Sequence, residues 1–322
     1  MTELQNTILG IDVAKLKLDV ALLWPGKTLT KQFPNTPAGC QLLSAWLTSL
    51  RLEQVHACLE ATGSYGDAIA LFLHEKGHLV SVVNPFRIKG YAASKMQRNK
   101  TDKADARLIA DFCLTQNPPQ WFPPPPQVAQ LQAFTRRIEA LEEMLAMERN
   151  RLEVAPATTQ RSITRIITTF EKEIASLQKS IKEHHEQNPD LKSQRQLLET
   201  IPGIGEKTAN LLLAEIDFAR YASAREVAAY AGVTPRKQES GTSLKGTSLS
   251  QMGNGRIRRG LYFPALVATG HNHIVKEFAR RLKENGKTPM QIVCAAMRKL
   301  LHIAFGVLKH KTPFAVNLAF SG

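Results

Sequence analysis

The chain has 322 residues, of which 43% are hydrophobic and 22% charged, so it is long enough for two or three soluble domains. Its net charge of +14 is concentrated near the end, where residues 235–322 hold 15 lysines and arginines against 3 acids. Such a surplus favours a polyanion. The chain does not open on a signal peptide and has no run of about 18 apolar residues for a membrane span. We therefore expect a cytoplasmic protein, with scattered reduced cysteines, whose polyanion is DNA or RNA and not a membrane.

Residues 1–116 alternate between strand and helix patterns. Short apolar or alternating runs predict strands over 7–13, 17–24, 28–33, 54–63 and 78–85. Helical spacing of apolar residues predicts helices over 35–50, 65–77 and 102–114. Three strands, a helix, a strand, a helix, a strand and a helix make up an α/β domain. No helix or strand is predicted between residues 86 and 100.

The segment NPPQWFPPPP (117–126) is expected to be a stiff linker, because its prolines exclude a helix and leave few donors for a strand. Beyond it, apolar residues recur three and four apart in two sets. The sets are Leu131, Phe134, Ile138, Leu141, Leu145 and Leu152, then Ile163, Ile167, Phe170, Ile174, Leu177 and Ile181. The spacing predicts coiled-coil helices over 127–192, either as an antiparallel hairpin or between molecules. The alternative is two amphipathic helices packed on their own domain, which Glu148 on the seam slightly favours.

The third region, 193–322, is predicted to be mostly helical. The expected helices cover 206–216, 223–231, 256–269, 273–284 and 289–308, and a mobile loop covers 239–255. At its start, IPGIGEKTA (201–209) resembles the turn of a helix-hairpin-helix, a module that binds the DNA backbone. Gly203, Gly205 and Lys207 would then lie at a phosphate. The alternative is a tight turn between helices with no ligand.

Four acids stand where a metal site would need them. Asp12 and Glu60 end predicted strands, and functional groups collect at the carboxyl ends of strands in open α/β sheets. Asp102 and Asp105 lie three apart at a helix start, so they face the same side. Four carboxylates suit two Mg²⁺ ions in phosphoryl transfer. Taken one by one, each acid also has a simpler interpretation, such as Asp102 stabilising its helix N-terminus.

Cations surround this acidic set and the C-terminal loop. Near the acids they are Arg87, Lys89, Lys95, Arg98 and Lys100, and around the loop they are Arg236, Lys237, Lys245, Arg256, Arg258 and Arg259. They would offset the repulsion between a phosphate backbone and the carboxylates, or they are merely solvated charges. A flexible serine among such cations is a potential nucleophile, although a loop that only contacts phosphate is the more common case. Spacing does not choose among Ser240, Ser243, Ser248 and Ser250.

Several motifs occur in a fixed order between Ile8 and about Pro313. They are GIDVAKLKLDV, LEATGSY, VNP followed by NKTDKADARLIA, IPGIGEKTA, YAGVTPRKQESG and GRIRRGLY. Together they resemble the DEDD transposases of bacterial insertion-sequence family 110. The resemblance implies a RuvC-like (ribonuclease H-type) domain at 1–116, a linker at 117–126, a coiled coil at 127–192 and a small helical transposase domain at 193–322.

The resemblance also implies the chemistry. Asp12, Glu60, Asp102 and Asp105 would hold two Mg²⁺ ions, with Mn²⁺ as a substitute, and the segment ESG would make Ser240 the nucleophile. Members of the family are recombinases guided by a non-coding RNA that pairs with target and donor DNA, and the heptad helices would assemble a dimer or tetramer. Ser240 and the acids would meet by folding, within one chain or between two.

Two other functions fit part of the sequence. A RuvC-like Holliday-junction nuclease would hydrolyse DNA with the four acids alone, and a non-catalytic DNA/RNA-binding protein would use only the cations. Sugar kinases and actin-like ATPases share the strand order, but the chain lacks their pair of phosphate loops and has an unsuitable basic tail.

Overall fold

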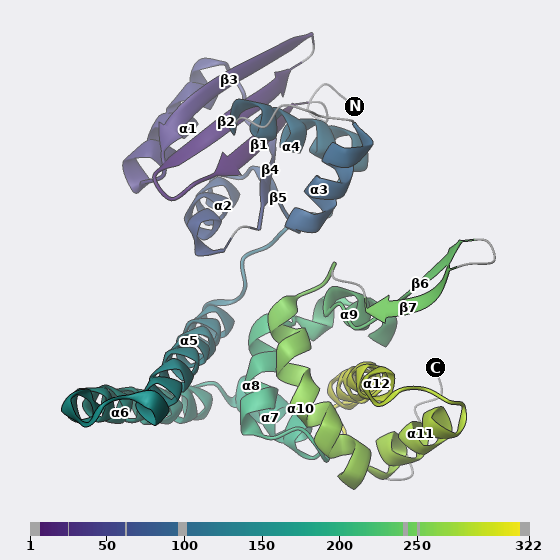
Figure 1. The fold of residues 1–322 in the computed structure, drawn as a ribbon. Coiled ribbons are helices and arrows are strands. Elements are labelled where there is room, and N and C mark those ends of the chain that lie inside the picture. The colour runs from purple at the N-terminus through teal and green to yellow at the C-terminus, as the bar shows by residue number, and fades with distance from the viewer. Residues whose placement is uncertain are drawn as a thin grey trace. The chain divides into compact units, whose positions relative to one another are not determined.

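The computed structural model describes residues 7–24, 26–61, 63–95, 102–240, 244–249 and 252–315. The chain forms two compact units, Met1–Pro123 and Pro124–Gly322, which we call unit 1 and unit 2 and treat separately (Figure 1). Each unit has a hydrophobic core of its own.

Unit 1 is built on a five-stranded mixed sheet with the order β3-β2-β1-β4-β5. The strands are β1 (Ile8–Val13), β2 (Lys17–Trp24), β3 (Lys27–Pro34), β4 (His56–Glu60) and β5 (Leu79–Val83). β2 runs antiparallel to both β1 and β3, whereas β1, β4 and β5 are parallel. All five strands lie where the sequence predicts them.

Alternation along the strands directs side chains into two layers of helices. The helices are α1 (Pro37–Ser49), α2 (Asp67–Glu75), α3 (Pro85–Ser94) and α4 (Asp102–Gln116), with a single 3₁₀ turn at Ser64–Gly66. Leu9 and Ile11 face the core that includes residues of α1 and α2. Ile8 faces the core that includes residues of α3 and α4, so the even-numbered positions of β1 point to α4.

α3 is an element that the sequence analysis missed. The basic residues of this segment obscured a helix that Asn84 begins, since its side chain accepts a hydrogen bond of 2.8 Å from the backbone N–H of Phe86. Pro85 at the first helical position and the buried Ile88 complete the signal.

The proline-rich segment between the units is anchored to unit 1 at its start. The backbone N–H of Trp121 donates a 2.6 Å hydrogen bond to Val80 O, and the Trp121 ring lies edge-on to His74. The following helix, α5, begins at Pro126, a residue of the predicted linker. Proline is well suited to that position because the first turn needs no donor there.

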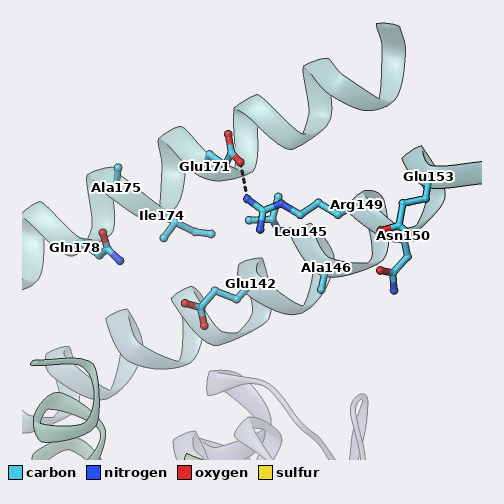
Figure 2. Close-up of a pocket in the computed structure, with 10 residues that line it drawn as sticks. All are labelled: Glu142, Leu145, Ala146, Arg149, Asn150, Glu153, Glu171, Ile174, Ala175 and Gln178. Atoms are coloured by element: carbon cyan, nitrogen blue, oxygen red, sulfur yellow. Dashed lines mark hydrogen bonds and ion pairs between the residues drawn. The ribbon is translucent and has the colours of Figure 1, made fainter. Parts of the chain in front are cut away.

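Unit 2 begins with a helical hairpin. α5 (Pro126–Val154) and α6 (Ala157–Gln187) pack against each other and are joined by Ala155 and Pro156. Figure 2 shows the open groove between them, where Arg149 of α5 donates a 2.8 Å hydrogen bond to Glu171 of α6. The buried seam residues belong to the same hydrophobic core as the rest of unit 2. The two helices therefore pack within one chain and onto their own domain.

The remaining helices of unit 2 enclose a single core. They are α7 (Pro189–Glu199), α8 (Glu206–Glu215), α9 (Ala224–Tyr230), α10 (Gly255–His271), α11 (His273–Glu284) and α12 (Pro289–His310), with a 3₁₀ turn at Phe218–Arg220. α12 is long and apolar enough to cross a membrane, but 56% of its apolar window is buried among these helices, as in a core helix.

The segment predicted as a mobile loop forms a two-stranded antiparallel ribbon instead. Its strands are β6 (Pro235–Ser240) and β7 (Leu244–Leu249). The prediction was wrong because serine and threonine occur in strands as well as in loops, whereas the glycines of this segment are more typical of a loop. We call this ribbon the arm. It extends from the side of unit 2 beside α9 (Figure 1).

Candidate active site

The predicted acids of unit 1 lie on one face of the sheet, the face that α4 covers. Asp12 is two residues beyond Gly10, and Glu60 is two residues beyond Cys58, which pairs with Gly10 across β1 and β4. Residues two apart in a strand face the same side, and Cys58 packs in the core of α4. Asp12 and Glu60 therefore follow each other on adjacent strands at their carboxyl ends.

Gly10 sets how closely α4 approaches this face. A Cβ at Gly10 would lie 2.2 Å from the carbonyl oxygen of Ala106 and 2.4 Å from the nitrogen of Ala110. Only a residue without a side chain permits this distance. Asp105 immediately precedes Ala106, so the contact brings the first turn of α4, with Asp102 and Asp105, to the strand end that carries Asp12.

The charges of the other carboxylates act on Asp12. The pKa of Asp12 is raised to about 6, first by burial and then by the negative charges of Asp105, Asp102, Asp19 and Glu60. The other three acids predicted from the sequence therefore each act on Asp12. Such a cluster favours a cation among its members.

The sequence analysis missed two charged residues of this cluster, Lys17 and Asp19. Asp19 on β2 pairs directly with Asp12 in the sheet, is only 3% exposed, and accepts a 2.9 Å hydrogen bond from Gln32. The ammonium group of Lys17 lies 3.1 Å from Asp19 and also forms an ion pair with Asp102. Alternation along the strand segment KLDVA places Lys17 and Asp19 on the same face as Ala21, and this pattern could have predicted that the two residues lie near the acids.

The chemistry of this donor set suits a hard divalent cation. It consists of carboxylate oxygens, one of them half-buried and held at a raised pKa by its neighbours. Among the described residues, Lys17 brings a positive charge to the cluster through its ion pair with Asp102. In the described part of the chain, no three acids, histidines or cysteines are close enough to form a ready metal cage. The carboxylates would therefore have to close around an ion.

The basic residues predicted around the acids differ in their surroundings. Arg87 and Lys89 are exposed on α3, and the guanidinium of Arg87 lies 5.3 Å from the centre of the Phe112 ring. Lys95 is held by an ion pair of 2.9 Å with Asp111. Arg98 and Lys100 lie outside the described residues.

In unit 2, three of the predicted DNA-binding cations are paired with acids of α5. Arg256 and Arg259 both form ion pairs with Glu139, the latter at 3.1 Å. Lys207 donates to Glu142 at 2.7 Å. These five residues line one groove of about 650 Å³ between α5, α6, α8 and α10. In this state the groove is close to electrically balanced rather than strongly basic.

The turn IPGIG has the expected place between α7 and α8, but its two glycines differ. Gly203 has φ of +104°, and a Cβ there would lie 2.8 Å from the Cβ of Ala268, so this glycine lets the turn pack on α10. Gly205 caps the start of α8 and has no neighbour that a Cβ would meet. Of the two, only Gly205 lies where a ligand could approach its backbone.

Ser240 is the last residue of β6, where its backbone pairs with Leu244. The strand positions of Arg236, Lys237 and Lys245 place these residues on the same arm, and Ser248 pairs with Arg236. Ser243 and Ser250 lie outside the described residues. At the root of the arm, Gly232 and Gly253 lie backbone to backbone, and the Arg258 guanidinium lies beside Gly232.

Comparisons with known proteins cover nearly the whole chain. A family model described as "Transposase" (DEDD_Tnp_IS110) matches residues 9–155, and one described as "Transposase IS116/IS110/IS902 family" matches residues 195–280. The pilin gene-inverting protein of Moraxella bovis is 34% identical over 97% of this chain and 98% of its own length. The chain belongs to the IS110 family of transposases.

This IS110-family transposase is also similar to another curated transposase and to one solved structure. The transposase for insertion sequence element IS1328 of Yersinia enterocolitica is 26% identical over 96% of this chain and 98% of its own length. A solved structure, T. thermophilus RuvC in complex with a Holliday junction substrate, matches 32% of this chain and 89% of its own, at 16% identity and a TM-score of 0.26. The stretch of this chain that the first family model matches includes the positions of all four acids, and the stretch that the second matches includes those of the IPGIG turn and the arm.

Proposed function

We propose that this IS110-family transposase is a DEDD recombinase that cuts and rejoins DNA with a serine nucleophile, Ser240. The observation that carries the proposal is the meeting of four carboxylates at the half-buried Asp12. The order β3-β2-β1-β4-β5, with β2 antiparallel to its neighbours, supports a ribonuclease H-like (RuvC-like) unit 1.

Asp12, Glu60, Asp102 and Asp105 would hold divalent cations, Mg²⁺ or Mn²⁺. When bound, these ions supply Lewis-acid stabilisation of charge on a phosphate. The negative charges of the carboxylates themselves would repel a DNA backbone. They therefore favour binding of a phosphate only together with cations, and Arg87 and Lys89 on α3 are exposed cations of the same unit that would guide the strand.

The nucleophile decides between recombination and hydrolysis. The hydroxyl oxygen of Ser240 would attack a phosphodiester phosphorus, forming a phosphoserine bond while a sugar hydroxyl leaves. This bond conserves the energy of the broken phosphodiester, so a second sugar hydroxyl can reverse the reaction and join a new strand. The four acids and Ser240 belong to different units, so the mechanism requires a unit 1 and a unit 2, of one chain or of two, to act on the same phosphate.

Recognition and assembly complete the proposal. A non-coding guide RNA would pair with donor and target DNA, so that the protein needs mainly backbone and shape contacts. A homodimer or homotetramer, assembled through the hairpin of α5 and α6, would bring two DNA strands together.

The test uses purified full-length protein with its guide RNA, donor and target DNA and Mg²⁺. Asp105→Asn and Asp12→Asn should retain the unfolding midpoint of the wild type within a few degrees and lose strand cleavage. Ser240→Ala should form no protein–DNA adduct on a denaturing gel. Full activity of either aspartate variant would refute the metal site.

Matched variants separate the steps. Asp111→Asn, on the same helix but paired with Lys95, should keep cleavage. Ser248→Ala, on the other strand of the arm, should keep the adduct. DNA cleavage by Ser240→Ala without any adduct would indicate hydrolysis and replace the recombinase with a nuclease.

A further inference from the structure

α12 leaves one basic stripe uncovered. Most of its faces are buried, from Val293 to Val307, as expected for a core helix. Arg298, Lys299 and His302 are half-exposed and lie one, three and four residues apart, which places them along one side of the helix. α9 packs against α12 and carries the exposed Arg225. We call Arg225, Arg298, Lys299 and His302 the α9–α12 patch.

The cations of this patch are not neutralised. Many arginines of unit 2 form ion pairs, such as Arg136 with Glu215 and Arg220 with Asp217. Within the part of the chain that the structure describes, Arg225, Arg298 and Lys299 form none.

The nearest acid in sequence is already engaged. Glu226, next to Arg225, accepts hydrogen bonds from the backbone N–H of Ala222 at 3.0 Å and from the hydroxyl of Ser223 at 3.2 Å. It therefore caps α9, and its carboxylate is not in an ion pair with Arg225.

His302 shows that the three positive charges converge. Burial lowers the pKa of its imidazole, and the charges of Arg298, Lys299 and Arg225 lower it further. Its Nε2 atom is buried and has no hydrogen-bond partner among the described residues.

One of the two helices that carry the patch, α9, is the helix that precedes the arm in the chain. α9 ends at Tyr230. Its carbonyl oxygen accepts a 2.7 Å hydrogen bond from the backbone N–H of Asn254, which follows the arm in the chain and precedes α10. At the other end of the patch, Lys309 of α12 donates to Ala222 O at 3.3 Å, which fixes α12 to the start of α9. Figure 1 shows the arm leaving the molecule beside α9. The patch and the arm therefore both adjoin α9.

We propose that the α9–α12 patch binds the phosphodiester backbone of the DNA strand that the arm acts on. The proposal rests on the function proposed above. In that function Ser240 on the arm attacks DNA, so the ligand of the neighbouring patch is DNA rather than RNA. Arg225, Arg298 and Lys299 each contact a phosphate, and the patch reads no sequence. It is separate from the groove around Glu139, whose cations are paired.

Salt dependence of binding tests the proposal directly. Fluorescence anisotropy with the full-length protein would measure Kd for a labelled DNA duplex of arbitrary sequence and for an RNA of equal length, over a range of NaCl concentrations. The triple variant Arg225→Gln, Arg298→Gln and Lys299→Gln should lower the slope of log K against log[NaCl] by about 3 for DNA, since each phosphate contact contributes about 1. Affinity for DNA near physiological salt should fall roughly 100-fold.

Two controls keep the result interpretable. A triple glutamine variant at Arg161, Arg165 and Lys172, exposed on α6, removes the same charge and should leave the slope unchanged. Arg225→Gln alone, at an exposed position, should lower the slope by about 1 without affecting the unfolding midpoint.

The outcomes separate this proposal from the proposed function. Wild-type DNA binding with an unchanged slope in the triple variant would overturn the patch and leave the recombinase intact. A loss confined to RNA would also overturn it, in favour of an RNA surface. Failure of the wild type to bind DNA at all would refute the proposed function itself.

Discussion

Gly10→Ala should damage both the stability of unit 1 and its candidate active site. The new Cβ would lie 2.2 Å from Ala106 O, whereas ordinary contact begins at 3.4 Å, so α4 would have to move away from β1 by about 1.2 Å. The clashing atoms belong to the α4 backbone and cannot rotate away. Overpacking of this kind costs about 1–3 kcal/mol. For a unit of this size we expect the melting temperature to fall by about 4–12 °C.

The same displacement carries Asp102 and Asp105 away from Asp12, because all of them depend on the contact at Gly10. A misplacement of about 1 Å can reduce a rate about 100-fold. Circular dichroism against temperature would measure the first effect, and strand cleavage with Mg²⁺ well below the melting temperature would measure the second. An unchanged melting temperature would refute the packing argument. A destabilised variant that cleaves at the wild-type rate would refute the link between α4 and the site.

Gly90→Ala is the matched control for this prediction. Gly90 lies within α3 of the same unit, and a Cβ there would meet nothing within 4 Å. Alanine in a helix interior is favoured over glycine by about 0.5–1 kcal/mol. This variant should therefore be at least as stable as the wild type and equally active.

Two further predictions concern charge. Glu139→Gln should free Arg256 and Arg259 from their ion pairs and make the slope of log K for DNA binding against log[NaCl] steeper by about 1–2. Glu143→Gln, which changes an exposed acid of the same helix, should leave this slope unchanged. Equal slopes in the two variants would contradict a DNA contact at these arginines. Burial lowers the pKa of His78, His185 and His302. Their unfolded pKa is about 6.5 and their folded pKa is lower. The stability they contribute is therefore complete above about pH 6.5 and is lost as the pH falls from there through the folded pKa, so the urea midpoint should drop as the pH is lowered below about 6.5. A level midpoint across that range would show that these rings do not stay neutral in the folded protein.

Most of unit 1 could be predicted because its strands are short, strongly apolar and bounded by turns. The positions of Asp12 and Glu60 at strand ends followed directly from that pattern. Asp19 could not be found in the same way, since a buried acid in a strand looks like an ordinary polar position until the register places it opposite Asp12. Lys17 was missed for the same reason, because its partner Asp102 is 85 residues away.

Unit 2 was less predictable because pairing across the chain decides its chemistry. Lys207, Arg256 and Arg259 are basic in sequence, but Glu139 and Glu142 on α5 neutralise them in this structure. Spacing predicted the two helices of the hairpin but not that α5 would face α8 and α10. The strands of the arm were missed because their residues have weak and mixed preferences, and strand formation depends on the partner strand.

The two units carry opposite charge at the surfaces proposed to meet DNA: an acidic cluster in unit 1 and a basic patch in unit 2. In unit 1 the acids cluster and raise the pKa of Asp12, and Lys17 is a cation within their reach, so the site repels DNA until further positive charge arrives. In unit 2 the cations of the α9–α12 patch, which form no ion pair among the described residues, would attract DNA without any cofactor. A strand would therefore bind first to unit 2 and enter the acidic site only together with metal ions. This order would keep cleavage dependent on a strand already bound beside Ser240.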